Sequence, residues 1–451
     1  LMDNERGQEA VRRRRVSMRM RALAAYGLGV VAAQATSQSE REFCFHYLLL
    51  ALSGDETSSH DLGVACVIAF GHVPLEIEPE VKRTDGGAST RAGQIRFLNE
   101  ILNDKQVHRR VRAQAPVAIA RLAAGLDPAD RDAVTRSLLE RLSPKVKNAD
   151  AQVQGLVQAL GRLGDDDEDQ LDTELRARLM EIAKDGDRIE KHLALIALAE
   201  VAGRRGAGDP GDAVIDTRSF LVKRALEGGS VERPWAVLAI GLLERARTAL
   251  GDAPAAGTRM FLVKRHAEAK SPSESAAYAI AFGLMHETDA LEALREQAVT
   301  GSERSRGAAM LALGWMSDSV QREFLVDALI HRGPPSLSRE AAIGLALMGD
   351  KRSVASVANS MTASRFVSVR IARILALGYL GDARAVDPLV GLIQSKREPA
   401  RIRAWAAASL GLICDKRPLT WNARLAEDVV WWDVPTTLLD PEGGRGILDR
   451  L

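Results

Sequence analysis

The histidines are the side chains of this protein best suited to bind a metal, and their spacing does not build a site. No two are separated by three residues, the spacing that places two imidazoles on one helix face, and none neighbours a cysteine at ligand spacing. We therefore expect no catalytic residue, no cofactor site and no metal site. The eight histidines are His46, His60, His72, His108, His192, His266, His286 and His331.

A short motif recurs along the chain and defines a repeat. The copy at 376–382 reads Ala-Leu-Gly-Tyr-Leu-Gly-Asp, and the copy at 312–318 reads Ala-Leu-Gly-Trp-Met-Ser-Asp. We call the small residue at the third position the landmark of its repeat. The eleven landmarks are Gly29, Gly71, Ala120, Gly161, Ala199, Gly241, Gly283, Gly314, Ala346, Gly378 and Gly411. They follow one another at 31 to 33 residues from Gly283 onward and at 38 to 49 residues before it.

This spacing predicts the fold. A step near 32 residues holds two helices of about three turns and two short turns. Each repeat carries apolar residues at helical spacing, such as Ile371, Ile374 and Leu375, and one helical pair cannot bury that stripe, whereas stacked pairs can. The composition is 46% hydrophobic but only 4% aromatic, which favours closely packed helices over a β-sandwich. We predict an all-α fold, an α-solenoid superhelix of about ten to eleven helical hairpins with a non-regular C-terminal cap.

The spacing also divides the chain. Residues 1–14 are predicted as a frayed or truncated start, 15–270 as irregular repeats with inserts, 271–415 as regular repeats, and 416–451 as a capping tail. The inserts are candidate binding loops, and they run from Val73 to Arg91, from Gly203 to Thr217 and near Leu250 to Thr258. A terminal repeat needs a cap, and the alternative for the tail is a docking motif. Its apolar residues are Trp421, Trp431, Trp432, Leu438, Leu439, Ile447 and Leu448.

Two charged columns accompany the landmarks. A cation in the first turn of a helix opposes the helix dipole, and aspartates in turns suit N-caps. We therefore predict a structural ladder between the two columns, with a recognition stripe as the alternative. The basic column, eight residues before the landmark, comprises Arg21, Arg112, Lys191, Arg233, Arg306, Arg370 and Arg403. The acidic column, four residues after it, comprises Asp165, Asp318, Asp350, Asp382 and Asp415.

The basic column is also the candidate partner-binding patch. Trp235 and Trp315 are candidate anchors, because tryptophan is enriched among interface residues that dominate binding. Trp405 lies in an alanine run, and we expect it to fill the core instead. The run from Asp165 to Asp169 is interpreted as a solvated turn that caps the next helix. The three cysteines, Cys44, Cys66 and Cys414, are interpreted as small buried hydrophobic residues.

One family resemblance rests on the best copies of the motif. The pattern Val369-Arg370-x-x-Arg373-x-Leu375-Ala376-Leu377-Gly378 resembles the HEAT repeat, and more narrowly the HEAT-like subtype first described in bilin lyases. The match is close over 300–415 and looser over 15–300. The chain is also similar to the C-terminal part of large bacterial HEAT-repeat proteins of unknown function. The resemblance implies a non-enzymatic scaffold that binds a protein on the concave face of a solenoid.

The same resemblance keeps enzymes among the alternatives. The main one is a bilin-lyase-type enzyme or enzyme subunit that binds a tetrapyrrole. HEAT-like deoxyhypusine hydroxylases bind di-iron through several His-Glu pairs, but Met285-His286-Glu287 holds one such pair, and we expect His286 to serve a helix C-terminus as a cation. A HEAT-like DNA glycosylase would need a basic groove, which the charge balance disfavours.

Charge and hydropathy limit the partners further. The 61 Lys and Arg against 60 Asp and Glu argue against a nucleic-acid partner, and the lack of a 20-residue apolar run argues against a membrane span. We expect a protein partner and no small-molecule ligand, with the oligomeric state open. The basic run Arg12–Arg15 before Ala22–Ser39 is similar to a secretory signal, but it fits the repeat register. The compartment stays open: the fragment favours the cytoplasm, and a signal upstream of residue 1 would imply export.

Overall fold

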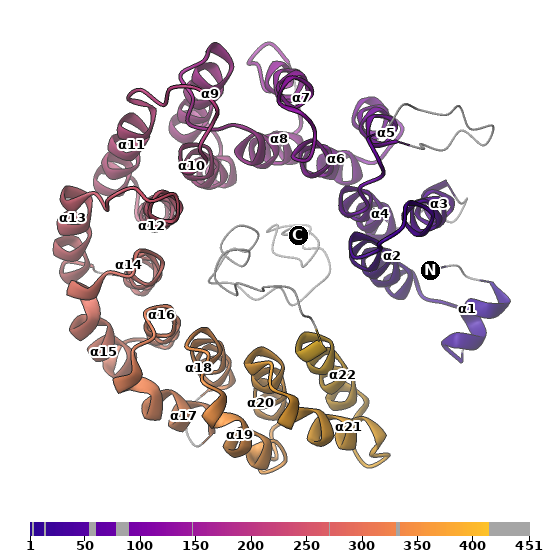
Figure 1. The fold of residues 1–451 in the computed structure, drawn as a ribbon, viewed down its shortest axis with the longest axis vertical. Coiled ribbons are helices and arrows are strands. Elements are labelled where there is room, and N and C mark those ends of the chain that lie inside the picture. Colours follow the sequence, from indigo (N-terminus) through magenta and orange to yellow (C-terminus); the bar gives the residue numbers. More distant parts are fainter. Residues whose placement is uncertain are drawn as a thin grey trace. The chain divides into compact units, whose positions relative to one another are not determined.

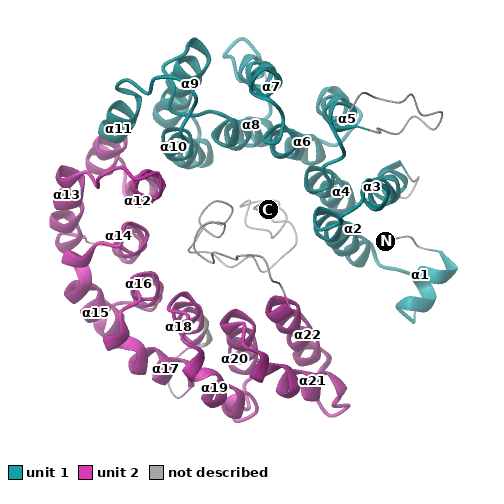
Figure 2. Cartoon of the chain, in the orientation of Figure 1, with its two compact units in different colours: residues 1–220, 433–451 teal, residues 221–432 magenta. Residues whose placement is uncertain are grey.

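The computed structural model is built of helices throughout its described part (Figure 1). It describes residues 1, 4–12, 15–53, 60–77, 90–146, 148–269, 271–330 and 334–414. The chain divides into two compact units, unit 1 with residues 1–220 and 433–451, and unit 2 with residues 221–432 (Figure 2). The predicted capping tail, with its tryptophans, lies outside the described residues.

The helices follow one another with short connections. Unit 1 contains α1 (Glu5–Ala10), α2 (Met18–Ala33), α3 (Gln38–Ser53), α4 (His60–His72), α5 (Arg91–Asn103), α6 (Arg109–Ala123), α7 (Pro128–Arg141), α8 (Asp150–Leu163), α9 (Gln170–Asp185), α10 (Arg188–Gly203) and the first part of α11 (Ala213–Glu227). Unit 2 contains the rest of α11 and then α12 (Arg233–Ala249), α13 (Ala256–Ala267), α14 (Pro272–Met285), α15 (Leu291–Thr300), α16 (Glu303–Trp315), α17 (Arg322–Ile330), α18 (Pro335–Leu347), α19 (Val354–Ser360), α20 (Val367–Leu380), α21 (Val386–Gln394) and α22 (Ala400–Cys414). Single 3₁₀ turns, η1 (Thr288–Ala290), η2 (Ser319–Gln321), η3 (Lys351–Ser353) and η4 (Ala383–Ala385), precede α15, α17, α19 and α21.

Each unit is a stack of two-helix hairpins. The even-numbered helices of unit 1 pack in order from α2 to α10, and those of unit 2 pack in order from α12 to α22. Within each unit they lie on the inner side of the arc, and the odd-numbered helices lie on the outer side (Figure 2). We call these the inner and outer helices. Every landmark lies in an inner helix, and the predicted all-α solenoid of stacked hairpins is confirmed.

The landmark glycines bring the backbones of successive inner helices together. A Cβ added to Gly241 would lie 2.7 Å from the Cα of Ala281, and one added to Gly71 would lie 2.7 Å from the Cα of Ala118. The residue met in this way stands two positions before the next landmark. This holds for Ala69, Ala118, Ala197, Ala281, Ala312, Gly344 and Ser409. The small landmark therefore has the packing role predicted from the sequence.

Local side-chain chemistry sets many helix ends. Ser17 accepts a hydrogen bond from the N–H of Met20 at the start of α2. At the start of α10, Asp187 accepts from the N–H of Glu190, and the Glu190 carboxylate accepts from the N–H of Asp187, which forms a capping box. Gly381 ends α20 with φ of 62°, a left-handed conformation that costs glycine no Cβ clash.

The predicted inserts are shorter than their sequence ranges. The insert from Gly203 to Thr217 is partly helical, because α11 begins at Ala213. The insert near Leu250 to Thr258 narrows to the connection before α13, which begins at Ala256. Most of the insert from Val73 to Arg91 lies outside the described residues. The boundary between compact units falls inside α11, whereas the boundary predicted at 270/271 concerns the regularity of repeat spacing and stays a prediction.

The close approach at the landmarks leads to a stability prediction. Gly241→Ala should destabilise the protein by about 1–3 kcal/mol, because the new methyl group meets the backbone of Ala281 in a packed interface. Gly391, in α21, has nothing within 4 Å of an added Cβ. Gly391→Ala should therefore stabilise by up to about 1 kcal/mol through helix propensity. Urea unfolding of the two variants measures the difference, and equal effects would contradict the packing role.

Candidate functional site

The basic column serves mainly to cap outer helices. Arg306 donates from Nε to the carbonyl oxygen of Ala298, in the last turn of α15, at 3.1 Å. Arg370 donates in the same way to Met361, the C-cap of α19, at 3.2 Å. A cation is unfavourable at the start of a helix and favourable at its end. Each arginine therefore offsets the unfavourable interaction with the start of its own helix by a favourable one with the end of the preceding helix.

Other residues of the basic column form ion pairs with carboxylates or are buried. Arg233 lies 3.2 Å from Glu274, and Arg370 lies 2.8 Å from Glu398. Arg21 is only 5% exposed, and its Nε donates to the carbonyl of Leu1 at 2.9 Å. The remaining members, Arg112, Lys191 and Arg403, are partly exposed on α6, α10 and α22. The column thus divides between the two units, and the structure uses most of it internally.

The predicted ladder exists, but its cations come from the outer helices. Arg295 of α15 donates to both carboxylate oxygens of Asp318 at 2.8 Å each, and these hydrogen bonds hold the pKa of Asp318 below its usual value. Arg322 of α17 lies 3.0 Å from Asp350 in the same arrangement. The prediction that the basic column supplies the cations is wrong, because its guanidinium groups reach the preceding helix ends instead.

The same tie recurs in both units. Arg131 of α7 lies 3.4 Å from Asp165, and Arg259 of α13 pairs with Glu287. Each arginine lies in the outer helix of a hairpin, and its carboxylate follows the inner helix of that hairpin, so the pair closes the hairpin on itself. The N-cap prediction holds for Asp318, which accepts from the N–H of Val320. It does not hold for Asp350, whose side chain makes no cap hydrogen bond.

Burial reverses two of the tryptophan predictions. Trp315 is 3% exposed and packs on Gly283, so it belongs to the core and cannot anchor a partner. Trp405 is 37% exposed on α22 rather than buried. Trp235 is partly exposed at the start of α12. Cys414 is likewise exposed, whereas Cys44 and Cys66 are buried as predicted.

The acidic run at 165–169, here called the aspartate turn, is only partly solvated, because its first two residues are buried while Glu168 and Asp169 are exposed. Asp165 and Asp166 are 3% and 1% exposed. The N–H of Gly206 donates to Asp166 at 2.8 Å, and the N–H of Gly208 donates to Asp167 at 2.9 Å. The predicted capping role is confirmed for Asp169, which accepts from a backbone N–H at the start of α9.

The glycine loop that holds this turn follows α10. Gly206, Gly208 and Gly211 have the G-x-G-x-x-G spacing of phosphate-binding loops, but the loop follows a helix rather than a strand. Its N–H groups face the chain's own carboxylates. The side chains of residues 165–167 lie within 4.8 Å of one another, and the glycine N–H groups supply the positive partners for two of them. The arrangement is a structural clasp between the α8–α9 and α10–α11 connections.

The His-Glu pair also has a structural place. His286 ends α14 with φ of 50°, and the carboxylate of Glu287 is 1% exposed and hydrogen-bonded by Arg259. His286 thus lies at the helix C-terminus where it was expected. Burial and then the charge of Arg245 lower the pKa of His286, which disfavours the cationic form, and its role as a cation there stays a prediction.

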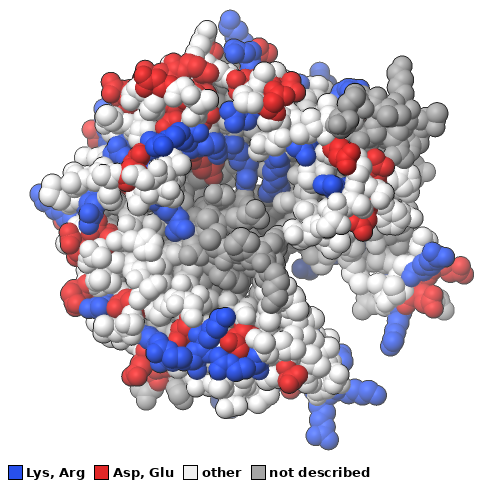
Figure 3. Space-filling view, viewed as in Figure 1, with Lys and Arg blue, Asp and Glu red and all other residues white. Residues whose placement is uncertain are grey.

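A different column separates the two units. The residue directly after the landmark is apolar or aromatic throughout unit 2: Leu242, Leu284, Trp315, Leu347, Tyr379 and Leu412. In unit 1, after Val30, it is polar: His72, Arg121, Arg162 and Glu200. Neither predicted column includes these positions, although the change of residue type at one fixed place in the repeat was visible in the sequence. In the view of Figure 3, Lys and Arg side chains of unit 1 gather over α8 and α10.

Three of these side chains and Tyr26 of α2 act on one another. We call Tyr26, His72, Arg121 and Arg162 the inner-face cluster. Burial, and next the charge of Arg162, lower the pKa of Arg121 to about 10, while Tyr26 acts in the opposite direction. Arg121 remains a cation at pH 7. Within the described part of the chain its guanidinium makes no hydrogen bond or ion pair.

His72 adds an unused polar atom to this cluster. Burial, followed by the charges of Arg121 and Arg162, lowers the pKa of His72 to about 3. The ring is therefore neutral, its Nε2 is buried without a hydrogen-bond partner, and its centroid lies 6.1 Å from that of Tyr26 in an edge-to-face contact. The cluster thus combines a half-buried cation, which makes no ion pair with a described carboxylate, and a neutral imidazole whose Nε2 is buried.

Comparison with known proteins supports the architecture. Residues 322–411 match the family model of HEAT repeats, and together with the stacked hairpins this match supports a HEAT-repeat protein. No curated protein sequence matches the chain. The narrower bilin-lyase subtype stays a prediction. Within the described residues, no helix has the length and apolar character needed to cross a bilayer.

Three solved structures are similar in fold. YibA of Escherichia coli is 16% identical, with 65% of this chain and 95% of that chain covered at a TM-score of 0.37. Human deoxyhypusine hydroxylase in complex with glycerol is 17% identical over 72% and 96%, with a TM-score of 0.28. An engineered protein is 19% identical over 86% and 98%, with a TM-score of 0.32. At these identities and scores the likenesses carry no argument about activity.

The capping role of the basic column is testable at Arg370. Arg370→Ala removes both the hydrogen bond to Met361 and the ion pair with Glu398, and it should lower the free energy of unfolding by about 1–3 kcal/mol. Arg401→Ala, at an exposed position at the start of the next inner helix, α22, is the matched control and should change little. Urea unfolding measures both. If neither variant is less stable than the wild type, the capping role is contradicted and the recognition hypothesis for the basic column is favoured instead.

The aspartate turn predicts a pH dependence. Burial, and then the carboxylates of Asp165 and Asp169, raise the pKa of Asp172 to about 7, against the hydrogen bond from the N–H of Asp165. A carboxyl group whose pKa is raised on folding stabilises the folded state at low pH, and this contribution is lost as the pH rises through 7. Asp172→Asn should therefore raise the melting temperature at pH 8, with the gain shrinking as the pH falls and disappearing only near pH 4, the ordinary pKa of an aspartate.

The amide of the Asp172→Asn variant still accepts the hydrogen bond from Asp165, so the comparison isolates the charge. Asp185→Asn, at an exposed position at the end of α9, serves as the control and should show no pH-dependent gain. Thermal unfolding between pH 4 and pH 8 decides the matter. A wild-type protein more stable than Asp172→Asn at pH 8 would contradict the raised pKa.

Proposed function

We propose that this chain is a non-enzymatic scaffold that binds an acidic polypeptide segment on the inner face of unit 1. Its architecture is a stack of hairpins in which each hairpin contacts only its neighbours, and such stacks commonly present extended binding surfaces. The observation that carries the proposal is the inner-face cluster, because Arg121 makes no hydrogen bond or ion pair with a described residue, whereas four of the seven residues of the basic column have partners within the chain.

Charge is the first argument. Arg121 is half-buried, its nearest acting charge is another arginine, and burial disfavours its charged form. A carboxylate supplied by a partner would reverse this situation by pairing with the guanidinium in a site that is already partly desolvated. Such charge-assisted hydrogen bonds are about twice as strong as neutral ones.

Geometry is the second argument. Tyr26, His72 and Arg121 come from the three successive inner helices α2, α4 and α6, which stack on one another. Their side chains therefore form a row along the stack rather than a closed pocket. A row of this kind fits an extended segment with an acidic side chain facing Arg121.

The alternative is a bilin-lyase-type enzyme or enzyme subunit, and it rests on the repeat subtype alone. A tetrapyrrole carries two propionate groups, which would also seek cations, so charge alone does not separate the two. Absorbance does: a lyase shifts the spectrum of an added bilin on binding, whereas a protein scaffold leaves it unchanged.

The scaffold proposal is tested with a labelled acidic peptide. Fluorescence anisotropy with a fluorescein-labelled peptide rich in Asp and Glu, at low ionic strength, should show saturable binding to the wild-type chain. Arg121→Gln should weaken that binding at least about tenfold, or 1.4 kcal/mol. The same substitution should leave the melting temperature unchanged or raise it, since Arg121 makes no internal bond to a described residue.

Arg136→Gln provides the matched control. Arg136 lies exposed on the outer helix α7 of the same unit, so this variant removes the same charge from the opposite row and should bind as the wild type does. A peptide with Asn and Gln in place of the acids should not bind. Equal weakening by both substitutions would indicate non-specific charge attraction and would sink the proposed site.

A further inference from the structure

The inner helices meet through two faces that recur along each stack. The donor face consists of the landmark and the positions seven and four before it and three after it. The receptor face consists of the positions nine, six and two before the landmark and two after it. Within each unit the inner helices pack in order, and at seven landmark glycines an added Cβ would meet the residue two before the next landmark.

The α2–α4 interface shows both faces filled. The donor residues of α2 are all buried, and they are Ala22, Ala25, Gly29 and Ala32. The receptor residues of α4 and the residue after it are each 0% exposed, and they are Leu62, Ala65, Ala69 and Val73. Small residues on the donor side thus meet larger aliphatic residues on the receptor side, which permits the close backbone approach.

At the start of unit 1 the receptor face of α2 is open. Met20, Leu23 and Val31 are 38%, 47% and 65% exposed, although their counterparts in α4 are fully buried. Gly27 stands two positions before the landmark of α2, at the place where the landmark of an adjoining inner helix packs in the other interfaces. It has nothing within 4 Å of an added Cβ. The neighbouring helix α3 extends this apolar face with Phe43, which is 60% exposed.

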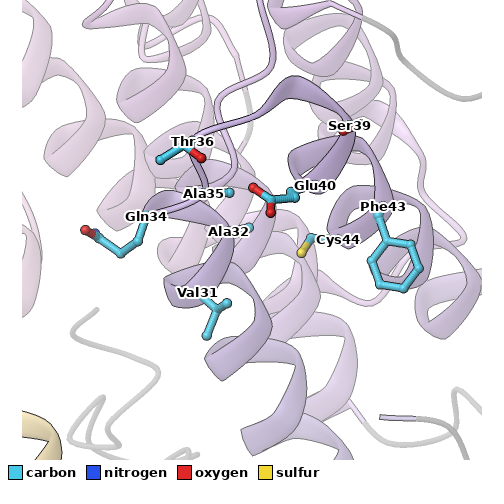
Figure 4. Close-up of a pocket in the computed structure, with 9 residues that line it drawn as sticks. All are labelled: Val31, Ala32, Gln34, Ala35, Thr36, Ser39, Glu40, Phe43 and Cys44. Carbon is cyan, nitrogen blue, oxygen red and sulfur yellow. The ribbon is translucent and has the colours of Figure 1, made fainter.

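A hollow lies beside this receptor face. It has a volume of about 660 Å³ and lies between the end of α2 and the start of α3 (Figure 4). Val31 and Phe43 flank it, and Ala35 and Cys44 line it with small side chains. The apolar face is therefore not flat, and it can take a ridge of side chains from a second helical layer.

At the end of unit 2 the donor face of α22 is open. The four donor positions are all exposed, and they are Ala404, Ala407, Gly411 and Cys414. They match the buried donor residues of α2 in size, with a landmark glycine at the same place. Gly411 has nothing within 4 Å of an added Cβ, whereas Gly378, one repeat earlier, would meet the Cα of Ser409 at 2.9 Å.

We propose that the open receptor face of α2 takes the donor face of α22 from a second copy of this chain. The two faces are the halves of the interface that already joins neighbouring inner helices, so the contact continues an established packing mode rather than creating a new one. The charge in the contact is low, because all eight facing positions are Met, Leu, Val, Ala, Gly or Cys. This interaction surface is separate from the acidic-segment site and does not depend on it.

The pairing of two different faces has a geometric consequence. A head-to-tail contact uses the donor of one copy and the receptor of the next, which leaves one of each free at the ends. Association therefore continues beyond a dimer, into open chains or a closed ring. Blocking either face on one copy should stop growth at that end only, and this asymmetry is what the experiment uses.

The test is sedimentation velocity of the full chain and of two single variants over a wide concentration range. Gly27→Arg blocks the receptor face and Gly411→Arg blocks the donor face, and both sites have open space in which the new side chain does not disturb the fold. The wild type should form species larger than a dimer as its concentration rises. Each variant alone should stay monomeric, with an unchanged melting temperature.

Mixing the two variants is the decisive arm. Gly27→Arg retains a free donor face and Gly411→Arg retains a free receptor face, so the mixture should form dimers and nothing larger. Gly257→Arg, at an open position in the outer helix α13, is the control and should associate as the wild type does. A wild type that is monomeric at every concentration overturns the proposal and assigns the α2 face to another occupant, such as a hairpin of a different polypeptide. Association that survives both single substitutions also overturns it.

Discussion

The close backbone approach between successive inner helices is the contact on which the rest of this structure depends. At Gly71, Gly241 and Gly283 the Cα of the next helix stands 2.7 Å from the place of an added Cβ, so a larger residue would push the helices apart and open the core between hairpins. Between α6 and α8 the approach shifts to Gly155, which faces the backbone of Ala113. The spacing of hairpins, and with it the position of every inner-face side chain, follows from these contacts.

The charged side chains described above serve mainly to hold hairpins together. Arginines at the start of inner helices satisfy carbonyl groups at the end of the preceding outer helix, as Arg306 does for α15. Arginines of the outer helices reach the carboxylate that ends their own hairpin, as Arg295 does for Asp318. Both uses place a cation where backbone or side-chain negative charge is otherwise unbalanced. Arg121 makes neither kind of contact with a described residue, so its charge is available to a partner.

The connections between hairpins are also held by hydrogen bonds, here between backbone N–H groups and carboxylates. In the aspartate turn, Asp165 and Asp166 are buried next to each other. The glycine loop donates N–H groups to Asp166 and Asp167, and Gly206 and Gly208 can approach these carboxylates because they carry no side chain. The charge of Asp165 is balanced by Arg131. An acidic cluster and a glycine-rich loop, each of which would by itself suggest a ligand site, thus serve as hydrogen-bond partners for one another. Such mutual satisfaction accounts for buried charge without a bound ion.

The sequence by itself determined the repeat, the hairpin, the landmark and the helix caps, because each depends on residues a few positions apart or on a period of about 32 residues. Only the tertiary structure decided the partners of the charges and the exposure of Trp315, Trp405 and Cys414. Long arginine side chains reach one of several acceptors within their length, and the choice depends on how two hairpins are rotated against each other. The same holds for the inner-face cluster, whose members lie about forty residues apart and meet because α2, α4, α6 and α8 stack.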